Sequence, residues 1–277
     1  MRIALLPIFL FAISACQKEE LVAVNNVAVV PSIPTEASGT TCVGVSNTDV
    51  FSTLKFKNTN TDGLKKYGCL LVNKVDKYPV FDGNEGIRFE VRNGDCSWNA
   101  TFNDCENDRS RHEIQEDETP QYTNQVITYT THVFIPFQNN FRPKGGNLMV
   151  LSQVNYMDQN NVFGALTYLV VEENNVLLIR THKGFSWDWN QNYTITKNPF
   201  DKWYEIKYEV KVSSKDDGYI KVFVDNTLLF QENRPTIPTD KGTVGLKFGI
   251  YNSFKARATE PYGTQVVFMD AFAKSVK

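Results

Sequence analysis

Three short segments carry side chains able to hold a carboxylate and move a proton, each at alternate positions. They are Arg111-x-Glu113, Gln153-x-Asn155 and Lys247-x-Gly249-x-Tyr251. Side chains at positions i and i+2 of a β-strand point to the same side of its sheet. If the three strands belong to one sheet, their guanidinium, amide, ammonium and phenol groups gather on a single surface.

The rest of the chain has the strand pattern that would position these residues. Runs rich in β-branched and aromatic residues, several alternating with polar ones, are separated by turn residues. The expected strands are 87–92, 126–135, 148–155, 163–171, 176–182, 203–212, 219–224, 227–230, 243–251 and 265–273. No stretch has an amphipathic helical period over three turns. The pattern predicts an all-β jelly-roll sandwich of two antiparallel sheets, in one domain over 42–277.

The order Arg-x-Glu, Gln-x-Asn, Lys-Phe-Gly-x-Tyr resembles the polysaccharide lyases with a jelly-roll fold. That group includes alginate lyases, heparin lyase of the first type, glucuronan lyases and some ulvan lyases. In the alginate enzymes the matching segments read Arg-x-Glu, Gln-x-His and Phe-Lys-Ala-Gly-x-Tyr. The resemblance extends over residues 80–275 and implies a concanavalin-like sandwich. It also implies cleavage of a uronic-acid-containing polysaccharide by β-elimination, with no required cofactor.

β-Elimination requires that the substrate carboxylate is held, the C5 proton removed and the leaving O4 protonated. Arg111, Gln153 and Asn155 suit the first role, because fixed donors stabilise the negative charge that develops there. Arginine is the best single candidate, since its fork grips a carboxylate through two bonds. Tyr251 matches the family tyrosine that transfers the proton. Lys247 and Arg111 could favour its phenolate, and Lys247 could instead bind substrate.

The sequence departs from the alginate pattern at Asn155, which stands where those enzymes have His. This difference puts the usual His base in doubt and leaves Tyr251 as both base and acid among the alternatives. It also argues against alginate as the substrate and favours ulvan, glucuronan or a related uronate polymer.

The three histidines of the chain are alternative bases. His182 shares a strand face with Arg180, and we rank it first, with Arg180 as a substrate-binding residue. His132 is a second candidate for the site. His112 is expected to point away from Arg111, because it is the next residue along the same strand.

Oxygen-bearing residues in a loop before the expected strand 87–92 and in the last expected strand suggest a structural calcium site. Asp82, Asn84 and Glu85 lie in a loop, and Asp270 lies in the last strand. Carboxylate and amide oxygens are the ligands that Ca²⁺ takes. The spacing fits no defined calcium loop, so the ion rests on residue type alone.

The N-terminus predicts export and a lipid anchor. Residues 3–13 are almost entirely apolar, and the following Ser14 and Ala15 precede Cys16, as in the lipobox of bacterial lipoproteins. We expect a signal peptide over 1–15, a lipidated Cys16 and a flexible tether over 16–41. The alternative is an ordinary secretory signal. The expected location is the bacterial cell envelope, at the outer membrane, facing the periplasm or the outside.

Four further cysteines are an even number, which favours disulfides in an exported chain. Cys96 and Cys105 flank a short polar loop and are expected to pair, leaving Cys42 with Cys69. The other two pairings remain open.

The formal net charge of −2 and the absence of a basic stripe give no indication of nucleic acid binding. We expect a monomer whose partners are an acidic polysaccharide and, through its anchor, a membrane. An anionic ligand would have to be attracted by a local patch, because the chain as a whole is not basic.

Two other functions suit the same fold. A non-catalytic glycan-binding lipoprotein would lack a base beside the three segments. A β-glucanase-like hydrolase needs two carboxylates at a set separation. Glu113, Gln115 and Asp117 share a face, but Gln115 breaks the Glu-Asp-Glu alternation of those enzymes. Glu113 is thus either a substrate-binding residue or only an ion-pair partner of Arg111.

Overall fold

The computed structural model describes residues 56–58, 67–96, 103–116, 122–139, 141–142, 145, 148–157, 163–186, 188–260 and 263–277. The expected signal peptide, the tether, Cys16 and Cys42 lie outside these residues. Within the described part, no helix is long and apolar enough to cross a bilayer.

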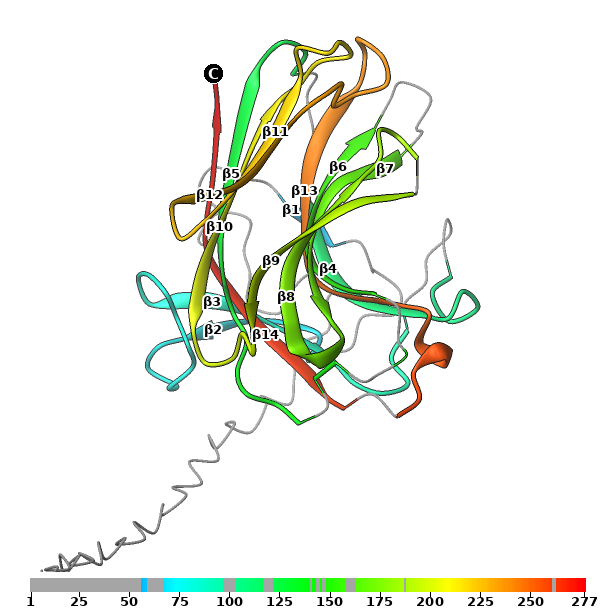
Figure 1. Ribbon diagram of the computed structural model, residues 1–277. Coiled ribbons are helices and arrows are strands. Elements are labelled where there is room, and N and C mark those ends of the chain that lie inside the picture. The colour runs from blue at the N-terminus through cyan, green and yellow to red at the C-terminus, as the bar shows by residue number, and fades with distance from the viewer. Residues whose placement is uncertain are drawn as a thin grey trace, which may run out of the picture. The chain divides into compact units, whose positions relative to one another are not determined.

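The described strands form two seven-stranded antiparallel sheets that lie one upon the other (Figure 1). The first sheet has the order β1 (Phe56–Asn58), β4 (Arg109–Glu116), β13 (Thr243–Ser253), β6 (Leu148–Met157), β7 (Phe163–Glu172), β8 (Val176–His182) and β9 (Trp189–Lys197). The second has the order β12 (Thr227–Asn233), β11 (Tyr219–Val224), β10 (Trp203–Lys211), β5 (Val126–Phe134), β14 (Gln265–Val276), β3 (Glu85–Val91) and β2 (Cys69–Asn73). Two short 3-10 turns, η1 (Glu173–Asn175) and η2 (Lys255–Arg257), follow β7 and β13. The predicted all-β jelly-roll sandwich is confirmed.

The main core lies between the two sheets and is built by the alternation seen in the sequence. In β10, for example, every second residue is buried, so that Tyr208 faces inwards and its neighbours face out. Phe89, Tyr129 and Phe248 are fully buried in the same layer. Burying each such side chain contributes about 1.5–3 kcal/mol relative to leaving it exposed, which fixes which face of every strand is turned inwards.

A smaller apolar cluster covers part of the other face of the first sheet. Its members are Leu148, Val150, Ala165, Tyr168, Val170 and Leu178. Strands β6 and β7 are therefore buried on both faces, which explains their nearly continuous apolar runs. Tyr251 packs against this cluster, so the polar side chains around it lie beside an apolar surface.

The loop between β3 and β4 is closed by a disulfide. Cys96 and Cys105 are bonded, with their Cα atoms 5.0 Å apart, which confirms that predicted pair. Cys69 is also disulfide-bonded, while its expected partner Cys42 lies outside the described residues.

Candidate active site

Strand register brings the three segments together on the outer face of the first sheet. Lys247 of β13 pairs with Gln115 of β4 on one side and with Gln153 of β6 on the other. The row continues through the next three strands, because each residue pairs with the one after it. The six side chains are Gln115, Lys247, Gln153, Tyr168, Arg180 and Asn192. A polar band thus crosses six strands of the sheet.

A bulge in β13 depends on glycine. The register with β6 is irregular between Phe248 and Tyr251. Within it, Gly249 has a φ of +137°, and a Cβ atom there would lie 2.2 Å from the carbonyl oxygen of His112. Neither the backbone angle nor the space suits any other residue. Gly249 therefore lets β4 and β13 approach closely at the centre of the site.

Four side chains beside this glycine are joined in one network of ion pairs and hydrogen bonds. Arg111 donates from Nε and Nη2 to the two carboxylate oxygens of Asp104, both at 2.6 Å. Its Nη1 lies 3.6 Å from Oε2 of Glu113, whose Oε1 accepts a hydrogen bond of 2.8 Å from Gln153 Nε2. Both carboxylates are almost fully buried, with side-chain exposures of 2% and 1%. This network links the β3–β4 loop to β4 and β6.

The guanidinium of Arg111 keeps its charge in this setting. Burial would lower its pKa, but the hydrogen bonds to Asp104 and the charge of Glu113 outweigh burial and raise it. The two-pronged grip predicted for the substrate is made with Asp104 instead. Asp104 was missed because nothing in its loop marks it as a partner of Arg111.

Tyr251 lies between two arginines. Its hydroxyl accepts a hydrogen bond from Arg109, and the Arg111 Cζ atom lies 4.5 Å from the centre of its ring. Burial raises the pKa of the Tyr251 hydroxyl, and the charges of Arg111 and Arg109 offset part of that rise. The hydroxyl is thus protonated at neutral pH. Strand alternation could have predicted Arg109, which stands two residues before Arg111 on the same face.

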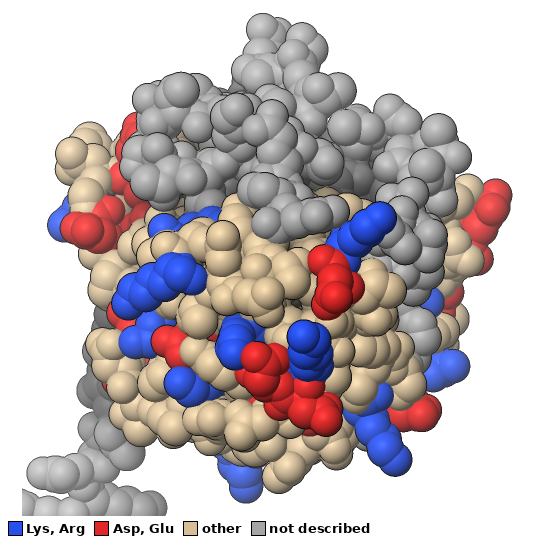
Figure 2. All heavy atoms as spheres, turned by 90° about the horizontal axis from the view of Figure 1, so that it is seen from above, with Lys and Arg blue, Asp and Glu red and all other residues tan. Residues whose placement is uncertain are grey.

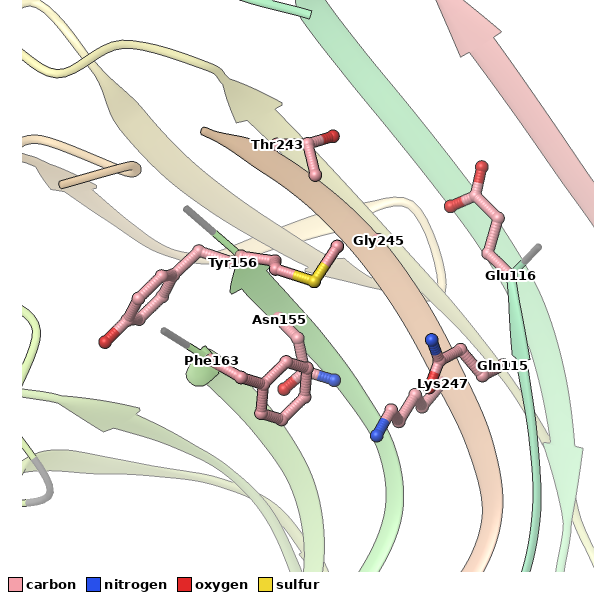
Figure 3. A pocket seen from close by; sticks show the side chains of 9 residues that line it. Gln115, Glu116, Asn155, Tyr156, Phe163, Thr243, Gly245 and Lys247 are labelled. Carbon is pink, nitrogen blue, oxygen red and sulfur yellow. The ribbon is translucent and has the colours of Figure 1, made fainter. Parts of the chain in front are cut away.

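A small pocket opens at the end of the polar band (Figure 3). Its volume is about 140 Å³, and it is lined by Gln115, Glu116, Asn155, Tyr156, Met157, Phe163, Thr243, Gly245 and Lys247. The ammonium of Lys247 lies 4.4 Å from the centre of the Phe163 ring. Figure 3 shows the ends of the Lys247 and Asn155 side chains near that ring. The pocket therefore combines a cation, amides and an aromatic surface.

Asn155 has an unusual place in this pocket. It is only 3% exposed, yet neither Nδ2 nor Oδ1 has a hydrogen-bond partner among the described residues. A buried amide costs about 1–3 kcal/mol of stability for each polar group that is left without a hydrogen bond. A ligand offering both a donor and an acceptor would relieve that cost.

His182 joins the site from the far side of the band. It is 1% exposed, its ring centre lies 5.0 Å from that of Tyr168, and its Nδ1 lies 3.2 Å from the carbonyl oxygen of Ser186. Burial lowers the pKa of His182 to about 4, outweighing the hydrogen bond to Ser186, and Arg234 and Arg180 lower it further. The imidazole is therefore neutral at neutral pH.

The structure does not bring the other two histidines to the site. His132 lies in β5 of the second sheet, where its ring stacks on Phe81 with centres 3.6 Å apart and its Nε2 lies 3.5 Å from Glu205. His112 points into the sandwich, is 1% exposed and lies 3.8 Å from Asp95, facing away from Arg111 as expected.

Arg180 and Tyr168 complete the band. Arg180 donates from Nε to Asn192 at 2.8 Å and forms an ion pair with Glu172, so the sheet itself holds its guanidinium. Tyr168 lies between Gln153 and Arg180 in the band. Burial raises the pKa of Tyr168, and the nearby Tyr251 adds to the rise. Sequence reasoning missed Tyr168 because it stands in an apolar run.

Asp270 has a structural role in the described residues. Its Oδ2 accepts hydrogen bonds from the backbone amides of Phe81 and Asp82, at 2.8 and 3.1 Å, and so ties the β2–β3 loop to β14. Burial raises the pKa of the Asp270 carboxyl, and these hydrogen bonds counteract part of the rise. Across the described ranges, no group of three or more His, Cys, Asp or Glu side chains is placed to hold a metal ion.

A jelly-roll sandwich with a tyrosine, two amides and several cations on one face can hold a carboxylate and transfer a proton. A family model described as polysaccharide lyase matches residues 52–273, and the chain therefore belongs to that family of enzymes. The family resemblance seen in the sequence is confirmed, and the match decides among the three candidate functions in favour of the lyase. No curated protein matches the sequence.

Three solved structures are similar to the chain. The marine alginate lyase from Aplysia kurodai has 13% identity and a TM-score of 0.54, over 87% of this chain and 100% of its own. The endo-β-1,4-glucuronan lyase from the fungus Trichoderma reesei has 13% identity and a TM-score of 0.52, over 79% and 94%. The alginate lyase from Pseudomonas aeruginosa has 16% identity and a TM-score of 0.50, over 69% and 83%. At these identities the likeness shows a shared fold.

Proposed function

We propose that this lyase cleaves a uronic-acid-containing acidic polysaccharide, ulvan or glucuronan foremost, by β-elimination that leaves unsaturated uronate ends. The observation that carries the proposal is Asn155, a buried amide beside Lys247 in the pocket, whose two polar atoms have no hydrogen-bond partner among the described residues. A uronate offers carboxylate oxygens to the amide N–H and to the ammonium, and hydroxyl groups to the amide oxygen. The similar structures named alginate and glucuronan lyases support the same substrate class.

Such a polyanion has to be attracted by a local group of positive side chains. The face seen in Figure 2 carries Lys, Arg, Asp and Glu side chains of both signs close to one another. The formal net charge of the chain is −2, so the whole molecule does not attract an anion. In the proposed complex Lys247, Gln153 and Asn155 hold the carboxylate, and Arg109 is the cation nearest the tyrosine hydroxyl.

Tyr251 carries both proton transfers in the proposed reaction. Its phenolate takes the C5 proton, the C5–H electron pair forms the C4=C5 double bond, and the C4–O4 bond breaks. The same hydroxyl then protonates the departing O4. A single residue can serve both steps where H5 and O4 lie on the same face of the sugar ring, as they do in D-glucuronate. This explains how a site with Asn155 in place of a histidine can work.

The charges of Arg109 and Arg111 stabilise the phenolate of Tyr251 and so lower its pKa, against the effect of burial. Because burial leaves the pKa of Tyr251 raised despite both cations, the phenolate fraction grows as the pH rises above neutral. We therefore expect kcat to increase from neutral to alkaline pH. Tyr251→Phe removes the proton carrier and leaves the ring in place.

The test follows the absorbance near 235 nm, where a 4,5-unsaturated uronate absorbs. The chain from residue 41 onwards is incubated with ulvan, glucuronan, heparin and alginate in turn. We expect a rise with ulvan or glucuronan that Tyr251→Phe abolishes and Tyr219→Phe, on the second sheet, leaves intact. A flat trace on all four polymers would contradict the proposed substrate class. A rise that survives in Tyr251→Phe would contradict the mechanism.

A further inference from the structure

We propose that Asp104 is a positioning residue for the reaction, which locks Arg111 against the ring of Tyr251 instead of leaving it to bind substrate. The proposal rests on the function above, in which Tyr251 carries the proton. It assigns Arg111 to the tyrosine and leaves the substrate carboxylate to the amides and to Lys247.

The geometry around Arg111 leaves little of its guanidinium for a ligand. Asp104 takes Nε and Nη2 in a two-pronged hydrogen bond, and Nη1 faces Glu113 at 3.6 Å. The side chain is 17% exposed. An arginine fork grips one carboxylate in this way, and the carboxylate it grips here belongs to the protein.

The loop that carries Asp104 is built to hold it in place. The neighbouring Cys105 is bonded to Cys96, which closes the loop. The backbone carbonyl of Asp104 accepts a hydrogen bond of 2.8 Å from the amide of Arg109, and the side chain of Asn103 accepts one of 3.0 Å from the amide of Cys105. These contacts fix the carboxylate of Asp104 in the loop just before β4, within reach of Arg111.

Asp104 also sets the charge that Tyr251 experiences. The charged and titratable groups that act on the Tyr251 hydroxyl are Arg109, Arg111, Glu113 and Tyr168. The carboxylate of Asp104 holds the guanidinium of Arg111 over the ring through two short hydrogen bonds. Without that carboxylate Arg111 would lose this position, its charge would stabilise the phenolate less, and the pKa of Tyr251 would rise further.

The test compares Asp104→Asn with Glu106→Gln in the full chain. Both changes remove one negative charge from the same loop, but Glu106 is exposed whereas Asp104 is buried. Asp104→Glu restores the charge on a longer side chain. Circular dichroism melting of each variant establishes that it is folded before any other measurement.

Two measurements separate this proposal from the proposed function. The first is the titration of Tyr251 by 13C NMR of labelled tyrosine rings, assigned with Tyr251→Phe, which needs no substrate. We expect the titration to move to higher pH in Asp104→Asn and to stay in place in Glu106→Gln. A Tyr251 titration that is unmoved, or that moves to lower pH, in folded Asp104→Asn would overturn the proposal, whatever the enzyme cleaves.

The second measurement is steady-state kinetics on the polymer that gives the 235 nm signal. Because Arg111 is placed on the tyrosine and not on the substrate, Asp104→Asn should lower kcat about tenfold to a hundredfold and leave KM within about twofold. Asp104→Glu should recover part of the loss. A rise in KM with kcat unchanged would instead show that Arg111 binds substrate, and would refute the assignment.

Discussion

Gly249→Ala tests whether the bulge at the centre of the site requires glycine. Its φ of +137° is one that side-chain-bearing residues rarely adopt, and such strain costs on the order of 1–3 kcal/mol. The new Cβ would also lie 2.2 Å from the His112 carbonyl oxygen and 2.8 Å from the Glu113 Cα atom. Both are backbone atoms, so β4 has to move, and forced overpacking adds typically 1–3 kcal/mol. The expected loss of unfolding free energy is therefore about 2–6 kcal/mol.

Gly83→Ala is the matched control for that experiment. Gly83 also has a positive φ, of +68°, but a Cβ there would meet nothing within 4 Å. The Gly83→Ala variant should lose only the free energy that comes from the strained backbone angle, about 1–2 kcal/mol. Urea unfolding of both variants measures the difference, and the 235 nm assay should be lost only in Gly249→Ala. If the two variants lose equal stability, the close approach of β4 and β13 at Gly249 is not what selects the glycine.

Two further predictions concern buried polar groups of the site. The pKa of His182 is about 4 in the folded protein and 6.5 for the free side chain. The unfolded chain therefore binds a proton at His182 more readily than the folded protein does. Up to about 3 kcal/mol of stability that is present above pH 6.5 is lost as the pH falls to about 4. His182→Gln should flatten the fall in urea midpoint over that range, and an unchanged slope would contradict the assignment. Asn155→Leu removes a buried amide that has no partner among the described residues, so it should raise the free energy of unfolding by about 1–3 kcal/mol while abolishing the 235 nm signal. A loss of stability would show that the amide is satisfied in the folded enzyme.

Local alternation was enough to predict which side chains share a face. Residues two apart on β4, β6 and β13 do gather on one surface, because burial of the apolar neighbours fixes the other face. Sequence spacing could not show that β13 lies between β4 and β6, since that order depends on pairing between segments about 90 to 140 residues apart. It also could not show that His132 lies in the other sheet.

The features that were missed have physical causes of their own. Strand β9 has the sequence WNQNYTITK, in which only Tyr193 and Ile195 continue an apolar alternation, and it forms because it pairs with β8 along one edge of the first sheet. Asp104 lies in a loop and reaches Arg111 only because the disulfide and a turn fold that loop back. The signal peptide, the tether and the lipidated Cys16 lie outside the described residues and stay predictions.

Asn155 stands in place of the family histidine, and its amide has no hydrogen-bond partner in the part of the chain that the structure describes. Both observations point to the same division of roles. A histidine at this position could act as a base, whereas an amide can only donate and accept hydrogen bonds. Arg111 and Arg180 are held by carboxylates of the protein, at Asp104 and Glu172. Of the residues predicted to transfer a proton, the structure leaves Tyr251 and the buried, neutral His182 at the site. His182 contacts Tyr168 and the Ser186 carbonyl, and the hydroxyl of Tyr251 is in contact with a cation. Tyr251 is the one of the two whose reacting oxygen is hydrogen-bonded to a cation, which offsets part of the rise in its pKa, and this is why we place both proton transfers on it.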